Sequence, residues 1–233
     1  DLHLCDRRQR QMCKETGTGS KYAADCTYYL SYIRYTQQRY DDALSGFLSL
    51  QDNAKYKTLA PYYIAEIYLV KKNYDKAEIV AQNYLSAYPN QKYTREMHRI
   101  QGTADSNFGK YHEAAEAFNR YLKDNTEPTR RRDALYMLGM SYYRTGVYSQ
   151  VPVILGEVTT GKDALTQNAY LHMGLAYLQL ADKNKARMAF EQAAASGTDL
   201  KIKEQAAYNY ALCIHETSYS AFGESVTVLS LIH

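Results

Sequence analysis

The pattern of hydrophobic and polar positions is clearest between Leu135 and Val158. Apolar residues recur at helical spacing, a Thr145-Gly146 pair interrupts them, and a second apolar series follows. The two series are Leu135, Leu138, Tyr142 and Tyr143, then Tyr148, Val151, Leu155 and Val158. Gly139 lies inside the first series, where Gly costs about 1 kcal/mol relative to Ala. The stretch therefore predicts two antiparallel helices that cross closely at Gly139.

The same unit recurs along most of the chain. A small residue marks each crossing, and by subtraction the intervals are 34, 37, 37, 35 and 37 residues: Ser31, Ala65, Gly102, Gly139, Gly174 and Ala211. Twelve residues later comes a second small or apolar residue: Ala43, Ala77, Ala114, Val151 and Ala186. Four residues further on, a bulky apolar residue follows in four of the five cases: Phe47, Phe118, Leu155 and Phe190, with Ala81 as the exception.

Several slots thus repeat together at fixed offsets, and a period of about 34 residues built from two helices is the tetratricopeptide signature. From about Lys21 to its end, the sequence resembles the tetratricopeptide repeat (TPR) superfamily. It departs from the family pattern in having no Trp and only Pro89 in the proline slot after a second helix. The resemblance implies an all-α fold, a right-handed α-α superhelix (TPR-like solenoid) of five to six helical hairpins.

The repeat also predicts the domain organisation. Residues 1–20 do not fit the period; if they are helical, they form the second helix of an incomplete preceding repeat. Residues 21–233 form one array with repeats at about 22–52, 58–90, 93–125, 132–160, 163–197 and 203–233. In the last repeat a turn is expected at ETSYSAFGES, and its second helix, beginning near Phe222, is cut short. Because VTVLSLIH is no polar cap, the chain either continues or this end packs on a partner, and self-association is expected.

Composition changes this picture in one respect, the 25 Tyr residues against 5 Phe. Tyr has an apolar body and a hydroxyl group that needs a partner or water, so it suits half-buried positions and binding surfaces. The net charge of +3 is too weak to predict nucleic-acid binding. The basic run Arg130–Arg132 is interpreted as a solvated turn between helices. The longest apolar run, near residues 226–232, is far shorter than a membrane span.

No pattern for catalysis or metal binding is found. His112-Glu113 and His215-Glu216 lack the second His of a zinc-protease helix, and no G-x-S-x-G elbow is present. The four cysteines contain no C-x-x-C pair, so neither a zinc site nor a disulfide framework is indicated: Cys5, Cys13, Cys26 and Cys213. The sequence therefore predicts a protein that is not an enzyme, without catalytic residues, cofactor or metal.

The remaining candidate site is a groove. In proteins similar to this one, the first helices of successive hairpins line the concave face. Inward positions then lie about three residues before the crossing residue and one, four and five after it, on one helical face. The groove residues taken from them are Tyr28, Tyr32, Tyr35, Tyr62, Glu66, Arg99, Asn107, Tyr136, Tyr143, Arg144 and Tyr208. The same offsets also give Leu69, Thr103, Ser106, Met140, Leu171, Leu175, Leu178, Leu212 and His215. The competing interpretation is that many of these side chains belong to the core between repeats.

These observations predict a non-catalytic scaffold that binds a peptide or partner protein in a tyrosine-lined groove, with no nucleic acid and no membrane insertion. Arg99 and Arg144 would pair with acidic groups of the ligand, and Glu66 would oppose them. The tyrosine-rich hairpins and YPN-type turn resemble Tol-Pal system repeat proteins and outer-membrane assembly lipoproteins, which favours the periplasm over the cytoplasm. The alternative is a regulatory or sensor module that holds a small ligand, or whose catalytic or DNA-binding domain lies outside this chain.

Overall fold

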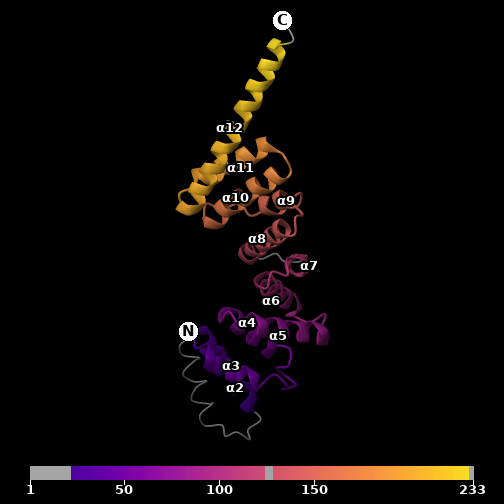
Figure 1. Ribbon diagram of the computed structural model, residues 1–233. Coiled ribbons are helices and arrows are strands. Elements are labelled where there is room, and N and C mark those ends of the chain that lie inside the picture. Colours follow the sequence, from indigo (N-terminus) through magenta and orange to yellow (C-terminus); the bar gives the residue numbers. More distant parts are fainter. Residues whose placement is uncertain (1–21, 124–127, 231–233) are drawn as a thin grey trace. The chain divides into compact units, whose positions relative to one another are not determined.

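The computed structural model describes residues 22–123 and 128–230, with the backbone alone for residues 216–230. The described residues form eleven α-helices and no strand, which confirms the predicted all-α fold (Figure 1). The chain divides into two compact units, Asp1–Tyr121 and Leu122–His233. The predicted N-terminal segment, residues 1–20, lies outside the described residues.

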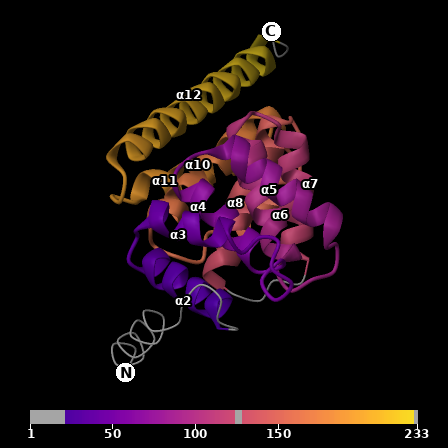
Figure 2. The same cartoon turned by 90° about the horizontal axis from the view of Figure 1, so that it is seen from below.

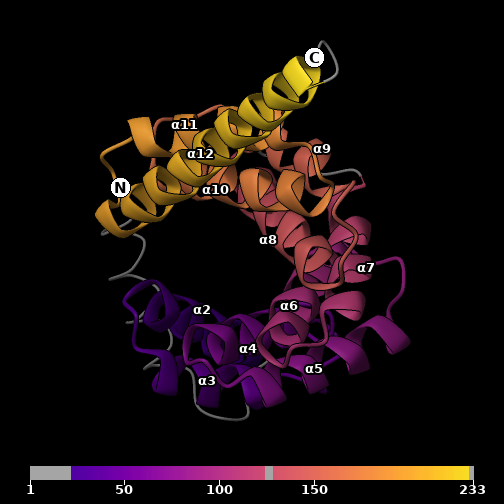
Figure 3. The ribbon, with the colours of Figure 1, turned by 45° about the horizontal axis from the view of Figure 1, so that its top comes forward.

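The first unit consists of three helical hairpins. Its helices are α2 (Ala23–Thr36), α3 (Tyr40–Leu48), α4 (Ala60–Val70), α5 (Tyr74–Ala87), α6 (Thr94–Asn107) and α7 (Tyr111–Leu122). Within this unit α2, α4 and α6 form one row of helices, and α3, α5 and α7 form the other (Figure 3). The first helices of the hairpins therefore share one face, as the resemblance to TPR proteins implies.

The second unit contains two hairpins and a long final helix. Its helices are α8 (Pro128–Arg144), α9 (Val151–Gly156), α10 (Ala164–Gln179), α11 (Lys183–Ala195) and α12 (Leu200–Ser230). The first part of α12 packs on α10 and α11, and the helix then continues beyond them (Figures 1 and 2). None of the described helices combines the length and apolar character that a membrane crossing needs.

The five hairpin turns share one backbone conformation. Seven residues after each crossing residue, the backbone is left-handed, with φ of 61°, 57°, 75°, 78° and 57° at Gln38, Lys72, Gly109, Gly146 and Ala181. In the first turn the Gln38 N–H donates to the Tyr35 carbonyl (3.0 Å) and the Arg39 N–H to the Arg34 carbonyl (2.8 Å). The other four turns repeat these two bonds. This pairing satisfies the last carbonyls of a helix and reverses the chain.

The crossings are as close as the small residues predict. A Cβ atom at Gly139 would lie 2.4 Å from Leu155 Cδ2, and one at Gly174 would lie 2.5 Å from Phe190 Cε1. At Gly102 it would lie 3.1 Å from Phe118 Cε2. In each hairpin, the bulky residue sixteen positions later thus fills the space that the glycine leaves.

Two elements differ from the sequence prediction. The second apolar series of the fourth hairpin was expected to be helical from Tyr148 to Val158, but α9 has only six residues, Val151–Gly156. Pro152 accounts for the start, because proline is tolerated only in the first turn of a helix. Gly156, a weak helix former, is its last residue.

The predicted sixth turn is wrong, because α12 is one helix of 31 residues. Ser218 occupies the slot that is left-handed in the other turns, a conformation that costs an L-residue about 1–2 kcal/mol. Gln38, Lys72 and Ala181 adopt this conformation in other turns, so the lack of Gly and Pro in residues 216–222 does not by itself account for the continuous helix. The apolar end near residues 226–232, predicted to self-associate, lies where no side chains are described.

The interpretation of Arg130–Arg132 as a solvated turn is also wrong, because these residues lie in the first turns of α8. Arg132 Nε donates to the Val158 carbonyl (2.8 Å), and Nη2 donates to Asp163 Oδ1 (2.7 Å) and Thr166 Oγ1 (2.6 Å). Hydrogen bonding from Arg132 and from the Thr166 N–H lowers the pKa of Asp163. Arg132 therefore connects α8 to the start of α10.

Candidate functional site

The eleven predicted groove residues all lie on first helices of hairpins or on α12. Seven belong to the first unit: Tyr28, Tyr32, Tyr35, Tyr62, Glu66, Arg99 and Asn107. Four belong to the second unit: Tyr136, Tyr143, Arg144 and Tyr208. Each unit therefore presents its own candidate surface.

The tyrosines of the first unit form stacks of rings. Tyr28 stacks on Tyr56, and Tyr62 stacks on Tyr93, both with ring centroids 4.8 Å apart. Tyr63, which the sequence analysis did not select, stacks on Phe47 at the same distance and is held edge-on by Tyr35 at 5.3 Å. Burial raises the pKa of Tyr28, and it raises that of Tyr63 further, with Tyr28 adding to the effect. Most of these rings pack in the core between neighbouring hairpins.

Two tyrosines of α2 remain open to solvent. Tyr32 is 38% exposed and Tyr29 is 42% exposed. Tyr32 is a predicted groove residue, whereas Tyr29 was missed although it precedes the crossing residue by only two positions. The ring of Tyr32 is still held at its inner edge by Tyr63, at 5.8 Å between centroids. This pair is one aromatic surface of the first unit, which also exposes Tyr22 (47%) and Phe108 (41%).

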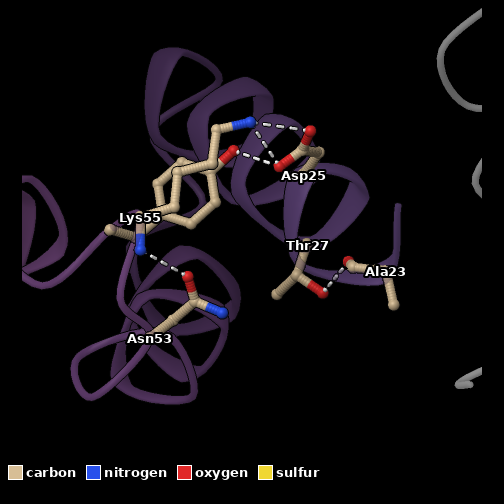
Figure 4. Close-up of polar contacts among 6 residues, drawn as sticks. Ala23, Asp25, Thr27, Asn53 and Lys55 are labelled. Carbon is tan, nitrogen blue, oxygen red and sulfur yellow. Dashed lines mark hydrogen bonds and ion pairs between the residues drawn. The ribbon is translucent and has the colours of Figure 1, made fainter. Parts of the chain in front are cut away.

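A polar cluster fixes the base of the stack (Figure 4). The Tyr56 hydroxyl donates to Asp25 Oδ1 at 2.8 Å, and Lys55 Nζ lies 2.8 Å from both carboxylate oxygens. Hydrogen bonds from Lys55 and Tyr56 lower the pKa of Asp25. The cluster thereby ties α2 to the segment before α4.

The sequence analysis expected Arg99 and Glu66 to offer opposite charges to a ligand. They form an ion pair with each other, and Arg99 Nε also donates to Glu96 Oε2 at 3.0 Å. Burial disfavours the Arg99 charge, but Glu66 and Glu96 outweigh it and raise the pKa of Arg99. Asn107 is exposed and donates its side-chain N–H to the Thr103 carbonyl at 2.8 Å. The charges at the middle of this surface are therefore neutralised within the protein.

In the second unit, two predicted residues enclose a histidine. The His172 ring lies edge-on to Tyr143 and Tyr136, with centroid distances of 5.7 and 6.5 Å. His172 Nδ1 lies 2.9 Å from the Asn168 carbonyl. Burial, helped by the nearby Arg144 charge, lowers the pKa of His172, although the hydrogen bond to the Asn168 carbonyl opposes this shift. Burial also raises the pKa of Tyr136.

A hollow of about 480 Å³ lies between α10 and α12. Its walls are Leu171, Leu175, Glu204, Gln205, Tyr208 and Asn209. Leu171, Leu175 and Tyr208 are inward positions by the offset rule, and Tyr208 is 66% exposed. The structure thus brings three predicted residues to one concave place. The polar residues of its rim were not predicted, because they lie outside the offsets used.

A second hollow, of about 390 Å³, contains no predicted groove residue. Its walls are Tyr170, Met173, Tyr177, Lys185, Met188, Ala189 and Gln192, from α10 and α11. The spacing of Tyr170, Met173 and Tyr177 along one side of α10 is a signal that the sequence contained. No group of His, Cys, Asp and Glu side chains in the described part of the chain could hold a metal ion.

The comparisons with known proteins bear on the fold. Two family models described as tetratricopeptide repeat match residues 101–149 and 168–196. Among solved structures, YrrB, a TPR protein with an unusual peptide-binding site, is 18% identical with a TM-score of 0.70, over 86% of this chain and 97% of that one. MamA is 17% identical with a TM-score of 0.62, over 81% of this chain and 96% of that one. No curated protein matches the sequence.

Proposed function

Because the chain is a tetratricopeptide repeat protein, we propose that it is a scaffold that binds an extended segment of a partner protein along its first-helix faces. The TPR fold supports a role in protein–protein interaction. TPR repeat proteins are generally non-catalytic scaffolds, and the proposal includes no reaction.

The observation that carries the proposal is the hollow between α10 and α12. Leu171, Leu175 and Tyr208 give it an apolar lining, while Gln205 and Glu204 place polar groups at its rim. An extended peptide uses both features, because its side chains are buried in apolar pockets and its main chain forms hydrogen bonds with polar groups. A volume of about 480 Å³ has room for a large peptide side chain.

The first unit would contact an uncharged part of the same partner. Tyr29 and Tyr32 expose ring surface and hydroxyl groups, which cover apolar side chains and still form hydrogen bonds. Arg99 is already neutralised by Glu66 and Glu96, so this surface has no strong preference for an acidic ligand.

A cell-envelope location is a further part of the proposal. It rests on the resemblance of the tyrosine-rich hairpins and the YPN-type turn to envelope repeat proteins. The full-length gene tests it, because a lipobox or signal sequence upstream is expected for an envelope scaffold. A catalytic or DNA-binding domain downstream would instead favour the regulatory alternative.

The binding test compares two exposed side chains of the second unit. A partner is captured from the source cell on the immobilised chain, and its Kd is measured for wild type, Tyr208→Ala and Val153→Ala. Val153, on α9, is 63% exposed and serves as the control. Tyr208→Ala should weaken binding by about 2 kcal/mol, a factor of roughly 30, without changing thermal unfolding. Equal Kd values for Tyr208→Ala and wild type would contradict the proposal.

Tyr136→Ala and Tyr143→Ala are less suited to this test. Both rings pack against His172, so truncation is expected to lower stability together with binding.

A further inference from the structure

Asp105 occupies a position where three of the other hairpins place a half-buried tyrosine. It lies three residues after the crossing residue Gly102, and three other hairpins have a tyrosine at this offset: Tyr68, Tyr142 and Tyr177. Asp105 is only 2% exposed. Its Oδ2 atom is buried and has no hydrogen-bond partner among the described residues. A carboxyl group in such a place needs an explanation.

Three features oppose a negative charge on this carboxyl group. It is buried, and it lies in the last turn of α6, where the helix dipole disfavours anions. Glu78 of α5 and Glu113 of α7 face it with like charge. The cation that acts on it is Lys110 in the following turn, and Lys110 Nζ is already 2.7 Å from Glu78 Oε1.

The carboxyl group also sits at the point that holds the turn closed. The main-chain carbonyl of Asp105 accepts hydrogen bonds from the N–H groups of Phe108 (3.1 Å) and Lys110 (2.9 Å). A change in the position of Asp105 therefore moves the end of α6 and the turn into α7 together.

We propose that Asp105 is a proton-operated switch of the third hairpin. The neutral carboxyl group favours the closed hairpin, and the ionised carboxylate loosens the end at which α6 turns into α7. The proton comes from solvent and returns to it, and no other bond is made or broken. The hairpin would thus tighten when the surroundings become mildly acidic, independently of any partner.

The sign of the pH dependence follows from the raised pKa. Burial first, and then Glu78, raises the pKa of Asp105 from 3.8 to about 6. Because the closed form binds the proton more tightly than the opened form does, its advantage grows as pH falls below about 6. With these two values, closure is favoured about tenfold more at pH 5 than at pH 8.

Hydrogen–deuterium exchange on the full chain tests the switch. Amides of residues 94–122 are compared at pH 5 and pH 8 after correction for the intrinsic exchange rate. Wild type should show about tenfold greater protection at pH 5. Asp105→Asn should lose this difference. Asp52→Asn, at an exposed carboxylate in the first unit, is the matched control and should retain it.

Three results would overturn the proposal. They are equal protection of wild type at both pH values, an unchanged pH response in Asp105→Asn, and loss of the response in Asp52→Asn. If Asp105→Asn does not fold, the carboxyl carbon of Asp105 in wild type is titrated by NMR. A midpoint near 6 supports the switch, and a midpoint near 4 contradicts it.

Discussion

The side chains packed where the two helices cross differ between the hairpins α2–α3 and α4–α5 and the hairpins α8–α9 and α10–α11. In the later pair, a glycine receives one large side chain, Leu155 on Gly139 and Phe190 on Gly174. In the early pair, small residues meet: Ser31 and Gly46 in α2–α3, and Ala65, Ala77 and Ala81 in one buried cluster of α4–α5. A Cβ atom at Gly46 would lie 1.9 Å from Ser31 Oγ.

In the early hairpins, aromatic rings that pack between neighbouring hairpins fill the space that the small residues leave. Tyr63 stacks on Phe47 and Tyr28 stacks on Tyr56, both at 4.8 Å. The comparison teaches that one repeat spacing is compatible with two kinds of core. Tyrosines at the same offset from the crossing residue are therefore packed in one unit and exposed in the other. Tyr28 packs on Tyr56, whereas Tyr208 is exposed.

The largest expected effect tests the glycine type of crossing. Gly139→Leu should lower the free energy of unfolding by about 3 kcal/mol, because even its Cβ would lie 2.4 Å from Leu155. Thermal or denaturant unfolding measures the change.

Gly156→Leu is the matched control for this substitution. No atom lies within 4 Å of a Cβ at Gly156, so the change should stay within about 0.5 kcal/mol. Equal stabilities of the two variants would mean that Gly139 is not at a tight crossing.

A smaller effect tests the tyrosine type of core. Tyr56→Phe keeps the ring that stacks on Tyr28 but removes the hydroxyl group that donates to Asp25. We expect a loss of about 1 kcal/mol in the free energy of unfolding. Tyr29→Phe, at an exposed ring on α2, should cost almost nothing. A Tyr56→Phe variant as stable as wild type would show that the rings hold this core without the polar cluster.

The hairpins and their crossings could be predicted from the sequence because they depend on local spacing. The short α9 could have been predicted from Pro152. The continuous α12 could not, because the chain turns at Gln38, Lys72 and Ala181 without Gly or Pro. Tyr63 was missed because its importance comes from the neighbouring hairpin, through Phe47 and Tyr35.

The ion pairs between hairpins contain a signal that the sequence analysis did not use. Their partners are about one repeat apart, at separations of 30, 30, 33, 32 and 31 residues: Asp25–Lys55, Asp41–Lys71, Glu66–Arg99, Glu78–Lys110 and Arg132–Asp163. Opposite charges one period apart at similar offsets face each other in a stacked array. This rule would have paired Arg99 with Glu66.

Site-specific photo-crosslinking in the source cell tests most directly whether the first-helix faces bind the partner. A photoreactive phenylalanine analogue replaces Tyr32 or Tyr208 on first-helix faces, and Ile79 or Val153 on second helices. All four positions are more than a third exposed, at 38%, 66%, 56% and 63%. The account predicts one crosslinked partner from Tyr32 and Tyr208 and none from Ile79 and Val153. Crosslinks confined to Ile79 and Val153 would contradict it.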